Sequence, residues 1–349
     1  MKPTENLSRN TEAVADSLAA MIKKELTIYS CHEGYLNPSD PTTITADDRM
    51  ALADWCYDVV DHCQFSRQTV ASAMEMVDRF LSMPSNSAES ARVSDEAVRD
   101  QIKFQLLTIA ALYISIKINE KRAISSELFA KMCGRAYTAE DIEDMERTLL
   151  SSLSWRCHAP TAHQVGLSIL SLVLPYVDIP EVTWGFLMDE MKYLTELAVR
   201  DYYFSTQRKS TIALAAIFNV ISDMSTKDHQ ELFGAFLRVV MECFDFDHSN
   251  QIDAARAKFS FLTEPDTVLQ ENEDDVDERS LDERSFDERS LDSLRTFRVS
   301  NRSSQKRDLE GHFWYQRDEL GHEQRVSPSS SLHDLSHEKQ DLQPSLHFC

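Results

Sequence analysis

Two alanine-bearing apolar stretches decide the fold: TIAALYISI at Thr108–Ile116 and TIALAAIFNVI at Thr211–Ile221. A helix without a polar face is buried on all sides, so each stretch predicts the central helix of a bundle. Each also lies third in a series of five segments whose apolar residues recur at intervals of three and four. The sequence therefore predicts an all-α protein of two five-helix bundles.

The ten predicted helices fall into two series. The first runs over Asp47–Gln64, Ser66–Met83, Gln101–Asn119, Ser126–Cys133 and Thr138–Trp155, and the second over Thr161–Leu174, Pro180–Tyr203, Lys209–Ser222, Lys227–Phe244 and Ser249–Phe261. Ser66, Ser125 and Thr138 stand where N-terminal caps are expected. A further amphipathic segment, Ala13–Ile28, is expected to pack against the first bundle. The Ser-rich stretch between Phe80 and Leu106 predicts a long loop.

Composition excludes several classes of protein. Seven of the 349 residues are glycine, where roughly 7% is usual, and their wide separation excludes glycine-rich nucleotide-binding loops. The net charge of −22 opposes binding to a phosphate backbone. The longest apolar runs fall short of the roughly 18 residues that span a bilayer. We therefore expect neither a nucleic-acid partner nor a membrane partner.

Metal and catalytic motifs are also missing from the sequence. Cys31-His32, His62-Cys63 and Cys157-His158 are adjacent pairs without zinc-site spacing. Asp245-x-Asp247 begins like a calcium loop but lacks its later glycine and glutamate. We expect no metal, no cofactor and no catalytic site.

The character of the chain changes after Leu262, where apolar periodicity stops. An acidic segment rich in Pro, Ser and Thr follows, with the repeat DERSL, DERSF, DERSL at Asp277–Leu291. Such a segment buries too little apolar surface to offset the entropy of ordering, so residues 263–349 predict a disordered acidic tail. The alternative for the repeat is a transient helix held by Asp/Glu–Arg pairs at i,i+4.

Three blocks of the first half, taken in order, resemble the cyclin box. They are RMALADWCYDVVDHCQFSRQTVASAMEMVDRFLS (Arg49–Ser82), LLTIAALYISIKINE (Leu106–Glu120) and YTAEDIEDMERTLLSSLSWRCHAPT (Tyr137–Thr161). YLTELAVRDYYF (Tyr193–Phe204) and STIALAAIF (Ser210–Phe218) resemble the C-terminal cyclin fold. The resemblance implies a tandem cyclin fold with an N-terminal extension (1–45), a cyclin box (46–158), a second cyclin fold (159–262) and the tail (263–349).

The resemblance implies a non-catalytic subunit that binds and activates a cyclin-dependent protein kinase. Lys117 and Glu146 match the family's Lys and Glu, which lie side by side and bind the backbone next to the kinase's αC helix. The same surface would include the residues Glu120, Phe80, Ile118 and Leu149. Without the resemblance, Lys117 is a cation near a helix C-terminus and Glu146 is one solvated acid among several.

A second pair, Arg49 and Asp78, lies within otherwise apolar segments, 29 positions apart like Lys117 and Glu146. In the family such residues form a buried ion pair that joins the first two helices. Losing one partner would leave an unpaired buried charge and cost roughly 3–5 kcal/mol. The alternative is two unrelated surface charges.

Two peptide-binding features of the family are altered here. In the groove that docks substrate peptides, Leu52 and Trp55 are present, but Asp48 and Ala51 replace apolar residues, which predicts a shallower and more acidic groove. The segment Tyr29–Glu33 has the Cys and Glu of the motif that binds retinoblastoma-like proteins, but Tyr in place of Leu. The alternative for that segment is an accidental match.

The class of cyclin is indicated by LSWRCHAPT (Leu153–Thr161), which resembles plant D-type sequences and implies action at the G1/S transition. Ser327-Pro328 has the form of a proline-directed phosphorylation site. The resemblance also implies a location in nucleus and cytoplasm. A different reading is a cyclin-fold scaffold or transcription-associated adaptor that does not act through a cell-cycle kinase.

Overall fold

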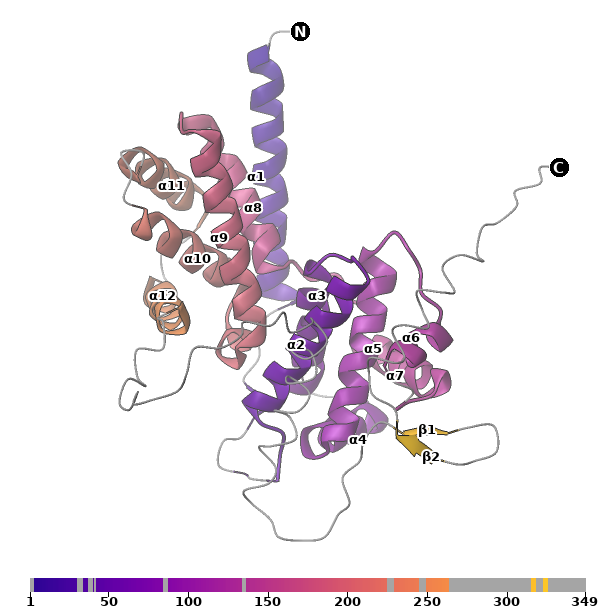
Figure 1. Ribbon diagram of the computed structural model, residues 1–349. Coiled ribbons are helices and arrows are strands. Elements are labelled where there is room, and N and C mark those ends of the chain that lie inside the picture. The colour runs from indigo at the N-terminus through magenta and orange to yellow at the C-terminus, as the bar shows by residue number, and fades with distance from the viewer. Residues whose placement is uncertain are drawn as a thin grey trace, which may run out of the picture. The chain divides into compact units, whose positions relative to one another are not determined.

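The computed structural model describes residues 3–29, 34–36, 40, 42–83, 87–133, 136–224, 229–244, 249–263, 315–317 and 323–325. The α-helices within these ranges are α1 (Pro3–Thr27), α2 (Ala46–His62), α3 (Gln68–Ser82), α4 (Ala88–Arg99), α5 (Gln101–Asn119), α6 (Ser126–Met132), α7 (Ala139–Ser152), α8 (Ala162–Val173), α9 (Glu181–Arg200), α10 (Lys209–Asp223), α11 (His229–Cys243) and α12 (Ser249–Thr263). Short 3-10 helices are η1 (Leu174–Tyr176) and η2 (Tyr202–Thr206). The predicted all-α class is confirmed, and all ten predicted helices are present (Figure 1).

Side-chain caps explain where several helices begin. Thr45, Thr138 and Thr161 each accept a hydrogen bond from the backbone of the third helical residue, whose own side chain accepts from the cap backbone in return. Ser125 caps α6 through the backbone N–H of Leu128. These reciprocal bonds satisfy donors that a helix N-terminus otherwise leaves free.

The packing divides the chain into two compact units. Unit 1 comprises residues 1–37, 70–83 and 156–281, and unit 2 comprises residues 38–69, 84–155 and 282–349. Unit 1 therefore holds α1, most of α3 and α8 to α12, while unit 2 holds α2 and α4 to α7. The domain boundaries expected from the sequence stay predictions.

Helix α5 is the centre of unit 2, where α2, α4 and α7 contact it (Figure 1). Every residue from Leu106 to Ile116 is buried. The polar side chains among them are satisfied, because Thr108 donates to the Phe104 carbonyl at 2.9 Å and Ser115 to the Thr69 carbonyl at 2.7 Å. Among the described residues, α5 is the helix long and apolar enough to cross a membrane, but 67% of that window is buried inside the protein, as in a core helix.

The stretch expected to be a long loop contains helix α4. Ser87 caps it by accepting a hydrogen bond from the backbone N–H of Ser90 at 3.1 Å. Ser90, Val93 and Ala97 form its buried face and recur at helical spacing. The loop prediction was wrong because small residues, rather than large apolar ones, make up this face.

Helix α10 is the centre of unit 1, with α8, α9 and α12 packed against it. Ten of its residues are buried, from Ser210 to Ile221.

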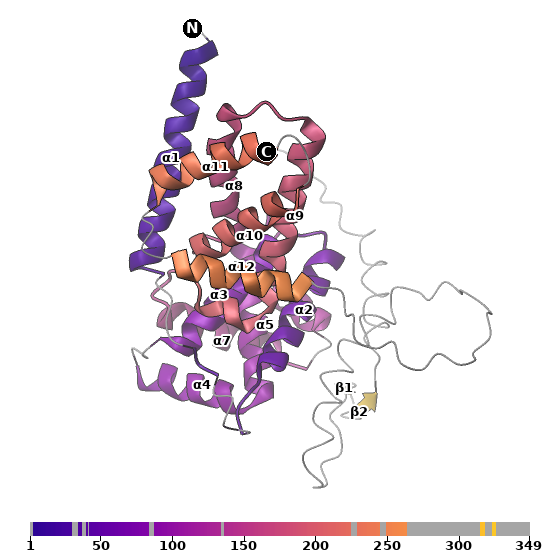
Figure 2. The same cartoon turned by 90° about the vertical axis from the view of Figure 1, so that its left-hand side faces the viewer.

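Figures 1 and 2 show α1 running beside α8, and Leu18 of α1 belongs to the same core cluster as Val165 and Ile169. The expectation that this N-terminal segment packs against the first bundle was wrong: its apolar face belongs to unit 1.

Part of the C-terminal tail forms a short β pairing. Strands β1 (Tyr315–Arg317) and β2 (Glu323–Arg325) are antiparallel, with Tyr315 opposite Arg325. The sequence analysis did not foresee this pairing. Residues 264–314 and 326–349, which carry most of the predicted disordered tail, lie outside the described residues.

A buried carboxylate links α1 to the start of α10. Glu25 is 4% exposed, and its Oε1 accepts hydrogen bonds from the Ser210 backbone N–H at 3.2 Å and from the Ser210 hydroxyl at 3.1 Å. The N-cap of α10, Arg208, contributes no side-chain bond, so Glu25 does the work of a cap from elsewhere in the chain. Burial raises the pKa of Glu25, and the two bonds from Ser210 only partly oppose that rise.

We predict that Glu25→Gln stabilises the protein at neutral pH. Because the pKa of Glu25 is higher in the folded chain, the wild type loses stability as pH rises from the ordinary glutamate range through the folded pKa. Glutamine cannot ionise, yet its amide oxygen still accepts both bonds. Melting temperatures measured across pH should therefore diverge in favour of the variant as pH rises. The exposed Glu12→Gln on the same helix is the control, and a pH-independent difference between Glu25→Gln and wild type would contradict the prediction.

Candidate functional site

The structure brings Lys117 and Glu146 together as an ion pair. Lys117 lies in the last turn of α5, Glu146 lies on α7, and Nζ of the lysine donates to Oε1 of the glutamate. The side chain of Lys117 is 36% exposed and that of Glu146 is 13% exposed. Both residues were singled out from the sequence, and both reach the surface of unit 2.

An aromatic ring lies against the ammonium group of Lys117. Lys117 Nζ lies 4.2 Å from the centroid of the Tyr113 ring, a cation–π arrangement worth about 0.5–1 kcal/mol at an exposed site. Tyr113 in turn stacks on Phe129 of α6, with centroids 5.3 Å apart. The sequence analysis missed Tyr113, although its position four residues before Lys117 on a helix places the two side chains on one face.

Negative charge surrounds this pair on α6 and α7. Ser126 donates to Glu143 Oε1 at 2.6 Å, and Glu127 lies next to Ser126 in the first turn of α6. The pKa of Tyr113 is raised, first by burial and next by the charge of Glu146. The phenol therefore stays neutral and serves as a platform, while Lys117 supplies the positive charge.

The arrangement presents a donor and an acceptor side by side. A lysine ammonium has three N–H donors, of which Glu146 takes one, and the second carboxylate oxygen of Glu146 remains an acceptor. A polypeptide backbone offers the complementary carbonyl and N–H. The pair can therefore bind the main chain of a partner without reading that partner's side chains.

Of the other residues expected at this surface, Ile118 is accessible and two are not. Ile118 is 43% exposed, whereas Leu149 is 0% and Phe80 is 4% exposed. Leu149 lies on the buried face of α7 with Ile142 and Met145. Leu149 and Phe80 as partner contacts are therefore corrected to core residues, because buried side chains cannot offer area to a partner.

Glu120 has a structural task within unit 2. As the C-cap of α5, it accepts hydrogen bonds through Oε1 from the Ser66 backbone N–H at 3.0 Å and from the Thr69 hydroxyl at 2.5 Å. These bonds tie the segment before α3 to the end of α5. Glu120 therefore has a role inside the fold, and its contact with a partner stays a prediction.

Arg49 and Asp78 are both buried charges, at 1% and 9% exposure. Asp78 Oδ1 accepts a hydrogen bond from the Tyr35 hydroxyl at 3.0 Å, and both residues belong to unit 1. Arg49 belongs to unit 2. The alternative of two surface charges is wrong, and their pairing stays a prediction.

The expected acidity of the groove at Leu52 and Trp55 is wrong. The carboxylate of Asp48 is 8% exposed and is held by the Thr45 backbone N–H at 2.8 Å and by the Gln101 amide at 3.0 Å. It caps α2 instead of lining a surface. Leu52 is buried and Trp55 half-buried, so peptide docking there stays a prediction.

Two predicted interaction segments lie largely outside the described residues. Of Tyr29–Glu33 only Tyr29 is described, and its ring lies 4.7 Å from the guanidinium carbon of Arg79. The side chain that stands in place of the motif's leucine thus already has an intramolecular partner. Ser327 also lies outside the described residues.

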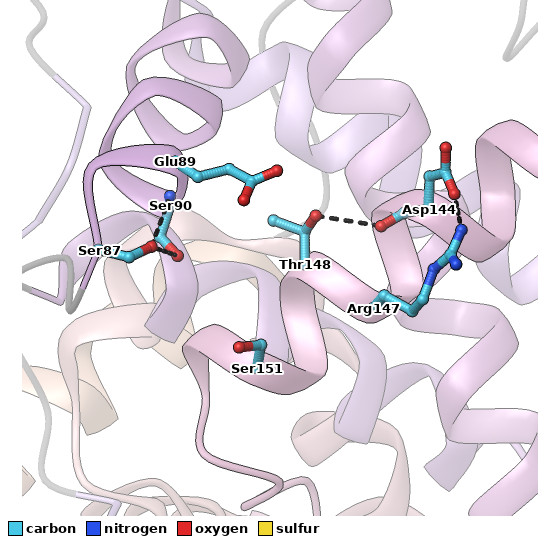
Figure 3. A pocket seen from close by; sticks show the side chains of 7 residues that line it. All are labelled: Ser87, Glu89, Ser90, Asp144, Arg147, Thr148 and Ser151. Carbon is cyan, nitrogen blue, oxygen red and sulfur yellow. Dashed lines mark hydrogen bonds and ion pairs between the residues drawn. The ribbon is translucent and has the colours of Figure 1, made fainter.

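A polar pocket of about 360 Å³ lies between α4 and α7 in unit 2. Figure 3 shows Glu89 reaching from α4 toward Thr148, and Arg147 paired with Asp144. The hydroxyl of Thr148 donates to the Asp144 carbonyl at 3.0 Å. Because Asp144 neutralises the Arg147 guanidinium and Glu89 adds a second carboxylate, the pocket disfavours the binding of an anion. Within the described ranges, no group of three His, Cys, Asp or Glu residues could hold a metal ion.

Comparison with known proteins places this site in a family. The family model "Cyclin, N-terminal domain" matches residues 16–158, a span that includes Lys117, Glu146 and all of unit 2's helices. This part of the chain is a cyclin N-terminal domain. The chain is 27% identical over 175 residues to Cyclin-A2-1 of Oryza sativa subsp. japonica (50% of this chain, 32% of that protein). It is 26% identical over 215 residues to the G2/mitotic-specific cyclin-A1 of Caenorhabditis elegans (61% and 39%).

These cyclin relatives carry A-type names, and the resemblance to D-type cyclins is not confirmed. The chain spans about a third to a half of the length of the curated relatives it matches. Among solved structures, a viral cyclin from herpesvirus saimiri aligns with a TM-score of 0.48 at 14% identity, covering 71% of this chain and 96% of that one.

We predict that Glu120→Ala destabilises the fold by about 1–3 kcal/mol, because the Ser66 and Thr69 donors lose a charged acceptor. Glu120→Gln, which keeps one acceptor oxygen, should cost less. Chemical denaturation of both variants measures the free energies of unfolding. Unchanged stability in Glu120→Ala would contradict the structural role and return Glu120 to the partner surface.

Proposed function

We propose that the chain is the non-catalytic regulatory subunit of a cyclin-dependent protein kinase. The observation that carries this proposal is the Lys117–Glu146 ion pair, supported on Tyr113 and bordered by the exposed Ile118. The match of residues 16–158 to the cyclin N-terminal domain supplies the class of partner.

The proposed mechanism is activation by differential binding. Phosphoryl transfer in protein kinases requires an ion pair between a strand lysine and a glutamate of the αC helix. Lys117 and Glu146 would bind the backbone beside that helix only when the helix lies inward. Because the subunit binds this state more tightly, it shifts the population toward the active kinase.

The contact surface in this proposal is smaller than the sequence suggested. Ile118 supplies exposed apolar area, while Leu149 holds α7 in place from beneath. Interfaces of this kind depend on a few central residues surrounded by nearly neutral contacts. The charged pair and Ile118 are therefore the positions at which substitution should act most strongly.

The test is kinase co-purification and histone phosphorylation with wild type and Lys117→Ala/Glu146→Ala. We expect the double variant to lose kinase binding by about tenfold or more and to lose the associated activity. Thermal stability should change less than kinase binding, because ion pairs near the surface contribute about 0–1 kcal/mol. Ile118→Ser should weaken binding in the same assay.

The matched control removes an exposed ion pair elsewhere in unit 2. Arg99 and Asp95 on α4 form such a pair at 3.0 Å, and Arg99→Ala/Asp95→Ala should bind kinase like the wild type. Undiminished binding by the Lys117/Glu146 variant would refute the site. Absence of any kinase from wild-type preparations would refute the function and favour the scaffold or adaptor.

A finer proposal concerns the phase of the cycle and the location. LSWRCHAPT supports action at G1/S, and the family supports a nuclear and cytoplasmic location. Relatives named G2/mitotic-specific favour a later phase. Immunoblots and imaging through a synchronised cycle separate the two: a peak before DNA synthesis supports G1/S, and a peak in mitosis contradicts it. Interaction with retinoblastoma-like proteins through Tyr29–Glu33 and phosphorylation of Ser327 belong to the same proposal.

A further inference from the structure

Helix α9 in unit 1 carries an apolar stripe on its exposed face. Val182 is 85% exposed, Phe186 is 49% and Tyr193 is 53% exposed. Their spacing of four and seven residues places them in one row along the helix. The opposite face of α9 packs against the core of unit 1 through residues such as Leu187, Met191 and Leu194, so burial within this unit leaves the stripe uncovered.

The same helix has a glycine next to this row, at position 185. Gly185 has open space around the position where a Cβ would stand, so packing inside unit 1 does not require glycine there. Glycine inside a helix is less favourable than alanine, and this one gains nothing in return from the fold. By contrast, a Cβ on Gly166 of α8 would come within 2.7 Å of the Met191 sulfur, which explains that glycine by packing.

The missing side chain at Gly185 leaves space beside the row of Val182, Phe186 and Tyr193. This shape suits the close approach of another helix. Small residues allow helix axes to come together, while apolar side chains on either side fill the space between them. A helix laid into such a surface is recognised through residues at helical spacing. The occupant indicated by this shape is an amphipathic helix.

Charge specifies the occupant further. Asp189 lies in the same row, between Phe186 and Tyr193, and forms no ion pair among the described parts of the chain. Glu181 and Glu190 border the row, while Lys192 is engaged with Glu196 at 4.0 Å. A second copy of this chain, itself at −22, would bring like charges together. A helix with basic residues on its flanks would instead complement Asp189.

We propose that the exposed face of α9, formed by Val182, Gly185, Phe186, Asp189 and Tyr193, is a docking surface for a basic amphipathic helix of a partner protein. The surface lies wholly within unit 1, whereas Lys117 and Glu146 belong to unit 2. The inference therefore stands apart from the proposed kinase contact, and either one can fail alone.

The test uses the full chain and a defined probe. The probe is a fluorescent helical peptide about 18 residues long, five turns, with leucines along one face and arginines on both flanks. A matched peptide carries glutamate in place of arginine. Fluorescence anisotropy at physiological salt measures both affinities for wild type, Phe186→Ser, Asp189→Lys and Gly185→Ala. We expect Phe186→Ser to weaken the arginine peptide by about tenfold or more, and Asp189→Lys to shift preference toward the glutamate peptide.

Gly185→Ala gives a signature that a purely structural role would not. Alanine should raise the melting temperature, since the site is open and alanine favours the helix, while the added methyl weakens peptide binding severalfold. Gly234 on α11 is the matched control, because it is equally open but has Glu231 and Arg238 as its neighbours at helical spacing. Gly234→Ala should raise the melting temperature and leave peptide affinity unchanged.

Three results would overturn the proposal. If the arginine peptide bound wild type and all variants with equal affinity, its binding site would lie elsewhere, such as on the acidic tail. No saturable binding by the wild type would remove the docking surface. Concentration-dependent dimerisation in sedimentation, abolished by Phe186→Ser, would assign the stripe to a second copy of the chain instead.

Discussion

The fold depends on hiding two helices that are apolar around their whole circumference. Transfer of apolar surface from water is the dominant favourable term in folding, and the central stretches of α5 and α10 have no face that tolerates water. Neighbouring helices must therefore enclose each of them: α2, α4 and α7 contact α5, and α8, α9 and α12 contact α10. The few polar groups inside α5 are bonded to backbone carbonyls, so the enclosure leaves no unsatisfied hydroxyl on Thr108 or Ser115.

The candidate site inherits its geometry from this enclosure. Ile116 is fully buried and Lys117, the next residue, reaches the surface, so the end of the core helix fixes where the ammonium stands. On the other side, Leu149 anchors α7 one turn from Glu146. Two helices packed against each other thus set the separation of two charges. A pre-organised pair loses little conformational entropy when a partner binds.

The sequence predicted the helices because they follow from local periodicity, whereas the charged pair was predicted from the resemblance of its surroundings to the cyclin box. Prediction from the sequence failed where the burial or bonding of a residue depends on which other element packs against it. The buried face of α4 includes Ser90 and Ala97, whose side chains are too small to be recognised in the sequence as an apolar face. The amphipathic pattern of α1 shows that a face is buried but not that Val165 and Ile169 cover it. Burial of Leu149, capping by Asp48 and the bonds of Glu120 likewise depend on contacts remote in the chain.

The bond between Glu25 and Ser210 spans 185 residues of sequence, and this has a consequence during synthesis. A ribosome adding about 5–20 residues per second needs roughly 10–40 s to make the chain between them. For most of that time α8, whose Val165 and Ile169 share a core cluster with Leu18, has not been made, and the apolar face of α1 is open to chaperones. Helix α1 therefore waits for two later helices before it is fully packed in unit 1: α8, which covers Leu18, and α10, which supplies the Ser210 donors for Glu25.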